Sequence, residues 1–351
     1  MTAISVTGVL QQRAWKHNLL PPVEQVREHI WSIPVPFPGN PMRYTLSYLI
    51  TGSGGAIIVD PGWRSETGLN HLGNGLHLAG IKAASVTGIV LTHYHPDHIG
   101  LAADVVRASG AWVALGKNEA RPFLTDDSSD RRTARQTRLE HWGVPAAVRN
   151  QILDRADISR QFEILSNVGL SLGDGDRIPL DGRNIEVIET PGHTRGHICL
   201  HEAESGTFFS GDHVLPRISP HISLEPGQSA NPLKDYFGSL DKITPYAAAE
   251  VLPGHEYRFR GLQHRTQQLH LHHEERAAEI QRVFDRHSPR TVWETARHLT
   301  WSRGWESLHG YALNFALAET AAHLAFLAAR EADEGKTPRV YDSALYAINH
   351  A

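Results

Sequence analysis

Four side chains of types that commonly bind metal ions stand within six consecutive positions of this chain: His93, His95, Asp97 and His98. They follow the apolar run 88–91, which is typical of a buried strand, and they precede a helix-favouring segment. A loop between a strand and a helix turns sharply, so the two histidines nearest the strand can point to one position. The next two side chains can then point to a neighbouring position. Imidazole and carboxylate together suit zinc, iron or manganese.

Three further candidate ligands share a local pattern of an apolar strand, a glycine and then the ligand. They occur in Gly192-His193, Gly211-Asp212 and Gly254-His255. Glycine lets the backbone turn tightly, so that the next side chain can face inward. Loops at strand ends of an α/β sheet converge on one edge, where sites form. We therefore expect all seven side chains to gather in one metal site.

The elements that must position these residues alternate between strand and helix. This alternation favours an α/β layer fold. We expect strands at 44–50, 56–59, 88–91, 111–115, 185–190, 198–201, 207–210 and 251–252, with helices near 66–80 and 99–109. Residues 117–165 are expected to form a helical insertion, with helices at 131–142 and 146–155, which serves as a solvated excursion or as a substrate wall. Helices are also expected near 262–287, 291–300 and 308–330.

Bulk composition narrows the class of protein. The 351 residues are 40% hydrophobic, enough for a sizeable core, and the formal net charge of −4 lacks the basic excess of most nucleic-acid binders. The one cysteine, Cys199, lies in an apolar run and is expected to be a buried hydrophobe in a reducing compartment. The first 20 residues do not resemble a signal peptide, and no uninterrupted apolar run has membrane-spanning length. We therefore expect a cytoplasmic protein without a membrane segment.

The ligand pattern resembles that of the metallo-β-lactamase superfamily. The resemblance rests on His93-Tyr94-His95-Pro96-Asp97-His98, followed in order by His193, Asp212 and His255, and it covers about residues 28–260. The segment Val59-Asp60-Pro61-Gly62 is similar to an early aspartate motif of the family. The resemblance implies an αββα sandwich, in which two mixed β-sheets are flanked by helices.

The tail after residue 262 is similar to a small winged-helix-like domain found in lactamase-like hydrolases, among them a ribonuclease. This similarity rests on the segment 211–216, Gly-Asp-His-Val-Leu-Pro, and on helical patterning after residue 262. It implies a metal-hydrolase domain over 1–262, which contains the insertion, and a helical winged-helix-like domain over 263–351.

The family implies two divalent metal ions, zinc first and iron or manganese as alternatives. One ion would be held by His93, His95 and His193, the other by Asp97, His98 and His255, and Asp212 would bridge them. Two ions roughly 3.5–4 Å apart can share a hydroxide and polarise a carbonyl or phosphoryl oxygen. Asp97 is expected to orient this hydroxide and later carry a proton to the leaving group. His213 is a second candidate acid, with a supporting or exposed position as its alternative.

Other residues are expected to orient the ligands through hydrogen bonds. Asp60 is the first choice, because its strand should lie beside the strand that precedes His93. Thr92, Thr190 and Ser210 are weaker candidates, since each is also an ordinary strand-end residue. A second histidine cluster comprises His264, His270, His272 and His273. We assign it to a solvated helix, because the cluster lacks a carboxylate or a glycine turn.

These expectations favour hydrolysis of a small ester, thioester or lactone, as by a thioesterase or lactonase, with a small-molecule substrate. A metal-dependent ribonuclease or phosphodiesterase is an alternative suggested by the tail, although the tail carries Glu274, Glu275, Glu279, Glu294 and Glu319. An iron-dependent oxidoreductase and a non-enzymatic regulatory protein are further alternatives. A true β-lactamase is disfavoured without an export signal. The sequence does not identify the substrate or the metal. A homodimer formed through apolar tail positions such as Leu313 and Phe326 is also possible.

Overall fold

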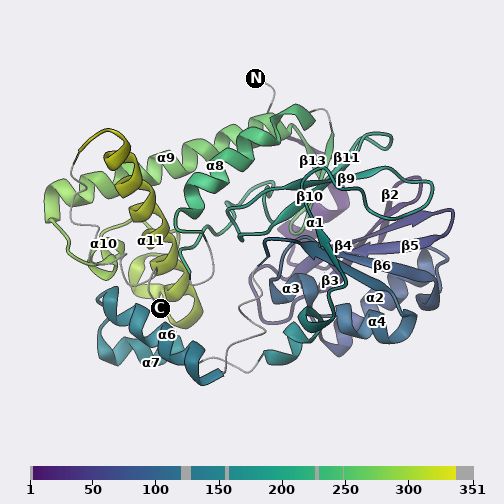
Figure 1. The fold of residues 1–351 in the computed structure, drawn as a ribbon, viewed down its shortest axis with the longest axis horizontal. Coiled ribbons are helices and arrows are strands. Elements are labelled where there is room, and N and C mark those ends of the chain that lie inside the picture. The colour runs from purple at the N-terminus through teal and green to yellow at the C-terminus, as the bar shows by residue number, and fades with distance from the viewer. Residues whose placement is uncertain (1–2, 120–127, 155–157, 226–228, 248, 337–351) are drawn as a thin grey trace. The chain divides into compact units, whose positions relative to one another are not determined.

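The computed structural model describes residues 3–119, 128–154, 158–225, 229–247 and 249–336 (Figure 1). Contacts between residues divide the chain into two compact units. The first, called here the sheet unit, comprises residues 1–121, 158–220 and 239–267. The second, called the helical unit, comprises residues 122–157, 221–238 and 268–351, so part of the expected insertion belongs with the C-terminal helices.

Two mixed sheets form the sheet unit, as predicted. The seven-stranded sheet has the order β2 (Glu24–Arg27), β3 (Ile30–Pro36), β4 (Tyr44–Gly52), β5 (Gly55–Val59), β6 (Val86–Leu91), β7 (Trp112–Gly116) and β8 (Leu170–Leu172). Strands β2 to β5 pair antiparallel, whereas β5 to β8 pair parallel. The carboxyl ends of β5 and β6 therefore lie side by side, and Asp60 and Thr92 follow these ends.

The six-stranded sheet has the order β1 (Ser5–Val6), β13 (Phe259–Arg260), β12 (Glu250–Pro253), β11 (Thr207–Gly211), β10 (Ile198–Glu202) and β9 (Ile185–Glu189). Its one parallel pair among the described strands is β11 with β12. This pairing brings the segments that follow the two strands, at Asp212 and His255, to the same edge.

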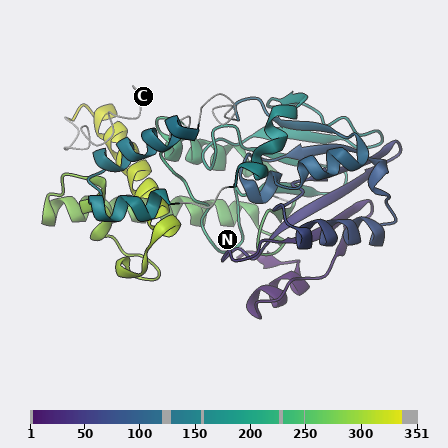
Figure 2. The same ribbon diagram turned by 90° about the horizontal axis from the view of Figure 1, so that it is seen from below.

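Helices cover the sheets, and short helical turns join the strands. They are α1 (Val9–Lys16), α2 (Glu66–Leu78), η1 (Ala83–Ser85), α3 (Pro96–Ile99), α4 (Ala102–Ser109), η2 (Ser159–Asn167) and η3 (Thr244–Tyr246). Helices α2 and α4 pack against strands of the seven-stranded sheet (Figure 2). The Ser65 hydroxyl caps α2 by accepting a hydrogen bond from the Gly68 amide, which fixes where this helix begins.

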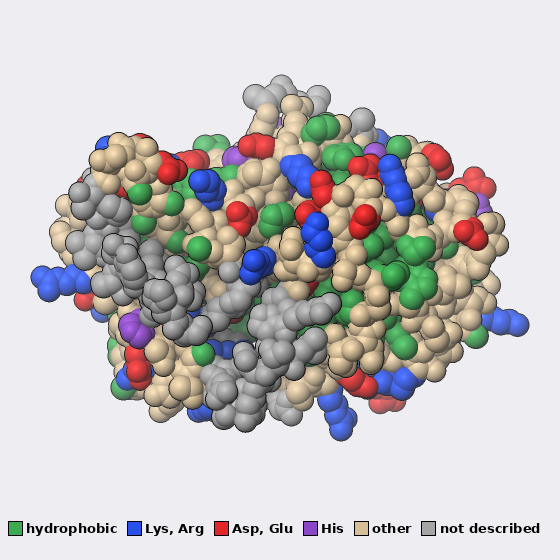
Figure 3. All heavy atoms as spheres, viewed as in Figure 1, with side chains coloured by type: hydrophobic (Ala, Val, Ile, Leu, Met, Phe, Trp, Pro, Cys, Tyr) green, Lys and Arg blue, Asp and Glu red, His purple; other side chains and the backbone are tan. Residues whose placement is uncertain are grey.

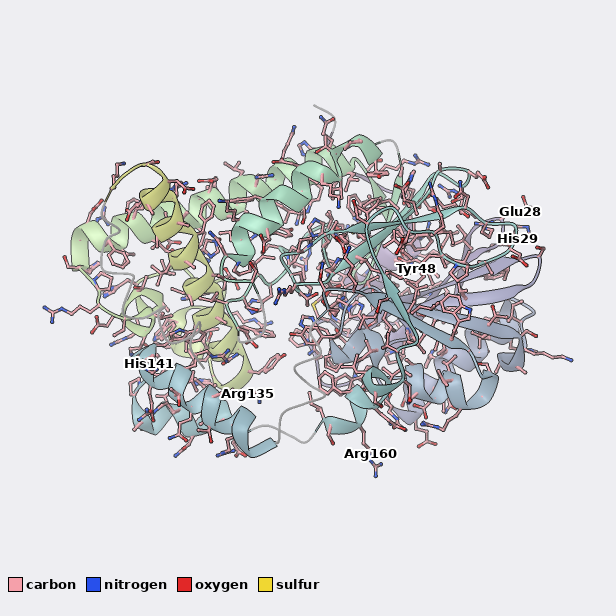
Figure 4. All side chains as sticks on the ribbon, in the orientation of Figure 1. Glu28, His29, Tyr48, Arg135, His141 and Arg160 are labelled. Carbon is pink, nitrogen blue, oxygen red and sulfur yellow. The ribbon has the colours of Figure 1, made fainter. Side chains whose placement is uncertain are left out.

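The core of the sheet unit lies between the two sheets. Tyr48 on β4, labelled in Figure 4, meets Phe209 on β11 edge to face, with ring centroids 5.4 Å apart. The Tyr48 hydroxyl donates to the Pro253 carbonyl at 2.8 Å, so a polar bond also joins β4 to β12. Cys199 on β10 is buried, as expected, and burial raises the pKa of its thiol to about 12.

The helical unit contains α6 (Ser128–His141), α7 (Ala146–Leu153), α10 (Val292–Arg297), η4 (Trp305–Ser307) and α11 (Gly310–Asp333), with parts of α8 (Pro232–Lys242) and α9 (Leu262–His287). Trp142, Ile280 and Leu317 lie in its apolar core. Over the described range 262–336 the chain forms helices and turns, and a winged-helix arrangement stays a prediction. One described helix, α11, is long and apolar enough to span a membrane, yet 61% of its most apolar window is buried within the protein.

The assignment of the second histidine cluster to a solvated helix was wrong for one residue. His273 on α9 is 1% exposed, and its Nδ1 lies 3.2 Å from Nε2 of His323 on α11. The helical period turns this position towards α11 while Leu271, two residues earlier, stays exposed. Composition alone did not indicate the buried side of the helix, because histidine occupies both sides.

Candidate metal centre

The structure brings all seven predicted ligands to one edge of the sheet unit, where four strands end. Strand β6 leads into the segment 93–98, β9 into His193, β11 into Asp212 and β12 into His255. Three groups have donor atoms within 4.8 Å of one another: His93 with His95 and His193, His93 with His98 and Asp212, and Asp97 with His98 and His255. The two sets of three that the family resemblance implied are two of these groups.

The first group, called here the three-histidine half, presents three ring nitrogens. Nδ1 of His95 lies 3.0 Å from Nε2 of His93 and 3.0 Å from Nε2 of His193. Burial and the neighbouring histidines lower the pKa of His93 well below its usual range, and burial lowers the pKa of His95 to about 3. Neutral imidazoles offer lone pairs, which is the form that a metal ion binds.

The second group, called here the mixed half, combines a carboxylate with two imidazoles. Asp97 Oδ2 lies 3.3 Å from Nε2 of His255 and 3.9 Å from Nε2 of His98. Asp212 lies between the halves: its oxygens are 3.4 Å from His98, 3.4 Å from His255 and 3.9 Å from His193. Burial opposes the charge of Asp212, but His255 and His98 outweigh it and hold the pKa of that carboxyl well below its usual range.

Hydrogen bonds from outside the cluster orient the rings. Asp60, as expected from its strand, accepts Nδ1–H of His98 at 2.9 Å and both the amide and the hydroxyl of Thr92, at 2.8 and 2.7 Å. The Thr92 hydroxyl lies 3.0 Å from Nδ1 of His93, and Nδ1 of His255 lies 2.8 Å from the Tyr44 carbonyl. With Nδ1 engaged in this way, Nε2 of His93, His98 and His255 is left to face the cluster.

The donor set fits divalent metal ions. Among the described residues, the buried atoms Nε2 of His98 and Oδ1 of Asp212 have no hydrogen-bond partner, although they lie 3.4 Å apart. Buried polar atoms are normally satisfied, because leaving one unpaired is costly. A cation between these atoms would satisfy both, and imidazole with carboxylate is a suitable ligand chemistry for it.

His213 lies apart from these three groups. Its side chain is fully buried, its ring centroid is 5.8 Å from that of His197, and burial lowers its pKa to about 3. Because this imidazole is neutral at physiological pH and inaccessible to solvent, a role in supporting neighbouring residues fits His213 better than a role as a catalytic acid. The role of His213 in proton transfer stays a prediction.

Sequence reasoning missed two buried residues beside the centre. His197 accepts a weak hydrogen bond from the Asp212 amide at 3.3 Å, and its Nδ1 lies 2.9 Å from the Thr190 hydroxyl. Glu119 bonds to the loops that carry His95 and His193, and burial raises its pKa to about 7 against the effect of these hydrogen bonds. Glu119 comes three residues after Gly116, the last residue of β7, and His197 comes directly after Gly196 but precedes β10, so neither shows the full pattern of a strand, a glycine and then the ligand. Ser210, one of the weaker candidates, bonds to the Val214 carbonyl instead.

Comparison with known proteins agrees with this geometry. Residues 41–255 match the family model of the metallo-beta-lactamase superfamily. The chain is 26% identical to the probable metallo-hydrolase YqjP of Bacillus subtilis, over 86% of this chain and 92% of that protein. It is 29% identical to the acyl-coenzyme A thioesterase MBLAC2 of Gallus gallus, over 74% of this chain and 88% of that protein. A solved metallo-beta-lactamase family protein from Thermus thermophilus, TTHA1429, superposes with a TM-score of 0.72 at 28% identity, covering 89% of this chain and 95% of its own.

Proposed function

The chain belongs to the metallo-β-lactamase superfamily and is a metal-dependent hydrolase, and from that premise we propose that it uses two divalent ions, zinc in the first instance, to hydrolyse a small acyl thioester. The observation that carries the two-ion proposal is the position of Asp212. Its carboxylate lies within 4 Å of ligands from both halves, 3.9 Å from His193 and 3.4 Å from His255.

The choice of a thioester among the expected esters, thioesters and lactones is supported by one relative. The acyl-coenzyme A thioesterase of Gallus gallus aligns over 88% of its own length, so the likeness extends well beyond the ligand motifs. Charge supports a small substrate over a polynucleotide. The net charge is −4, and basic and acidic side chains are interspersed over the face shown in Figure 3.

Each group of residues has a distinct role in this proposal. His93, His95 and His193 would hold one ion, Asp97, His98 and His255 the other, with Asp212 shared. When bound, divalent ions in such a site polarise a carbonyl oxygen and lower the pKa of water to about 7. Asp60, Thr92 and Tyr44 keep Nδ1 of the ligand rings engaged, so that Nε2 is presented to the cluster.

Asp97 is the residue best placed to move a proton. Its side chain is 14% exposed, whereas those of His98 and His255 are at most 1% exposed. Its Oδ2 lies 3.3 Å from His255 Nε2, and the Thr45 hydroxyl donates to its backbone carbonyl at 2.7 Å, which fixes the loop. We assign to Asp97 Oδ2 the acceptance of the proton from the attacking water and its delivery to the leaving thiolate.

The test is metal analysis of the purified protein followed by a substrate panel. We expect the wild-type protein to contain two equivalents of divalent metal per chain and to release free thiol from acyl-coenzyme A substrates. In His95→Ala we expect lower metal content and strongly reduced thiol release. The panel includes lactones, phosphodiesters and short RNA, and oxygen consumption is followed in parallel. A metal-loaded protein that leaves every thioester intact while cleaving another class would overturn the substrate proposal. Oxygen uptake in place of hydrolysis would favour the iron-dependent alternative.

A further inference from the structure

Glu119 is a buried carboxylate at the edge where the metal centre lies. It follows β7 by three residues, and it is 3% exposed. Three donors bond to its oxygens: the Tyr94 amide at 2.8 Å, the Thr194 hydroxyl, which lies 2.8 and 3.0 Å from the two oxygens, and the Gly196 amide at 2.7 Å. Burying a carboxylate is costly unless it is well bonded, and here both oxygens are occupied.

The partners of Glu119 belong to two segments that are distant in sequence. Tyr94 stands between His93 and His95, so a hydrogen bond to its amide holds the backbone that carries both ligands. Thr194 follows His193 directly, and Gly196 lies two residues further on. One side chain from a third segment therefore bonds to both loops of the three-histidine half.

Two glycines bring the backbone of these segments into direct contact. A Cβ at Gly196 would lie 1.9 Å from the amide nitrogen of Glu119, and a Cβ at Gly116 would lie 2.1 Å from the Gly196 carbonyl oxygen. Both clashes are with backbone atoms, which cannot rotate away. The loop after His193 thus packs directly against the backbone at the end of β7. This close packing fixes the distance between the Glu119 carboxylate and the loop.

The mixed half has a different anchor. Asp60 bonds to Nδ1 of His98 and to Thr92, whereas Glu119 accepts hydrogen bonds from the Tyr94 amide beside His95 and from the Thr194 hydroxyl beside His193. Two carboxylates, one after β5 and one after β7, therefore each support a different half of the cluster. His93 is the ligand that both reach, Asp60 through Thr92 and Glu119 through the Tyr94 amide.

We propose that Glu119 is a positioning residue for the three-histidine half, holding the His93–His95 loop and the His193 loop at the separation that one metal ion requires. This inference rests on the proposed two-ion centre, and it deepens it by assigning separate control of the two halves. Loss of the Glu119 hydrogen bonds selectively lowers the affinity for the metal ion of the three-histidine half. Outer partners of metal ligands commonly contribute about 10–100-fold in metal affinity, and this is the size of effect expected here.

The experiment compares Glu119→Gln with the wild-type protein. The amide NH2 of glutamine meets an N–H donor whichever way it is turned, because Tyr94 and Gly196 donate to opposite oxygens. Glu163→Gln is the matched control, since Glu163 is an exposed carboxylate in the same unit that pairs with Arg64 and Arg107. Affinity for each equivalent of zinc is measured by chelator competition, and the ligand field is followed in the visible spectrum of the cobalt-substituted proteins.

The expected result is a loss of about 10–100-fold in affinity for one equivalent, with the other changed by less than about threefold, and an altered cobalt spectrum. Glu163→Gln is expected to match wild type in both measurements. Thr194→Val, which removes one donor and keeps the side-chain volume, is expected to give a smaller loss at the same equivalent. It provides the test if Glu119→Gln does not fold.

Two results would overturn the inference. One is unchanged affinity for both equivalents in a folded Glu119→Gln protein, and the other is equal loss at both equivalents that tracks the fraction unfolded by circular dichroism. A wild-type protein that binds no divalent metal would overturn the proposed two-ion centre instead. The two failures are therefore distinguished by the wild-type measurement.

Discussion

Oδ2 of Asp60 lies 2.9 Å from Nδ1 of His98, at the point where β5 and β6 end side by side. The parallel pairing of the two strands places these residues together, although neither belongs to a strand. Asp60 adopts a left-handed backbone conformation, with φ of +52°, that aspartate and asparagine tolerate better than most residues. The bond fixes the ring of His98 and turns its Nε2 towards Asp212.

Asp60→Asn tests this relationship without disturbing the backbone, because asparagine also accepts the left-handed conformation. We expect metal affinity at the mixed half to fall about 10–100-fold, since the side chain can no longer accept bonds from both Thr92 and His98. Zinc competition titrations measure the loss. Asp181→Asn, at an exposed aspartate in the same unit, serves as the control. Unaltered affinity for both zinc equivalents in Asp60→Asn would contradict the assigned role.

Removal of individual ligands should separate the two halves. We expect His95→Ala to lose the ion of the three-histidine half and Asp212→Ala to weaken both ions, because Asp212 reaches both halves. Each variant should lose more activity than the roughly 10–100-fold typical of outer partners. Elemental analysis and thioester turnover on the same preparations give the measurement. Full activity in a metal-depleted double variant would refute metal-dependent hydrolysis.

Gly196→Ala probes the close approach of the His193 loop to β7. An alanine Cβ there meets the Glu119 amide nitrogen at 1.9 Å, so the loop must move and take His193 with it. We expect lower zinc affinity and a decrease in unfolding free energy of about 1–3 kcal/mol. Gly73→Ala in α2 is the matched control, because nothing lies within 4 Å of its added Cβ and alanine favours a helix. Comparable stability of the two variants would argue against the tight seating.

Acid should weaken the helical unit through Glu319. Burial opposes the charge of this carboxylate, but His221, whose Nδ1 lies 3.8 Å from Glu319 Oε2, and nearby basic groups outweigh it and lower the Glu319 pKa from 4.5 to about 2. A lowered pKa stabilises the folded state above pH 4.5, and this contribution is lost as the pH falls from 4.5 towards 2. Glu319→Gln should therefore cost about 1–3 kcal/mol at neutral pH.

The measurement for Glu319 is denaturant unfolding of wild type and Glu319→Gln at a series of pH values. The difference in unfolding free energy should be present above pH 4.5 and shrink below it. Glu275→Gln, an exposed position on α9, should show no such dependence. A difference between wild type and Glu319→Gln that does not change with pH would indicate that the side chain acts through packing.

Much of the sheet unit followed from local patterns. The strands near 44–50, 88–91 and 207–210 and the helix at 262–287 lie where periodicity and glycine turns indicated them. Strands β1, β2, β3, β8 and β13 were missed. β1 and β13 have two residues each, and β3 contains Pro34 and Pro36, which disfavour a strand assignment. Their pairing with neighbours, and not their own composition, makes them strands.

The sequence by itself indicated the candidate metal ligands, because the evidence is local: four such side chains within the six positions 93–98, and a glycine followed by a histidine or aspartate after each of three further strands. Tertiary structure alone decided which nitrogen of each ring faces the cluster, since this depends on partners such as Tyr44 and Asp60 from other strands. It also decided that Glu119 clamps two loops and that His273 is buried against His323. These contacts join segments that are far apart in the chain. They arise from tertiary packing, and no local spacing in the sequence indicates them.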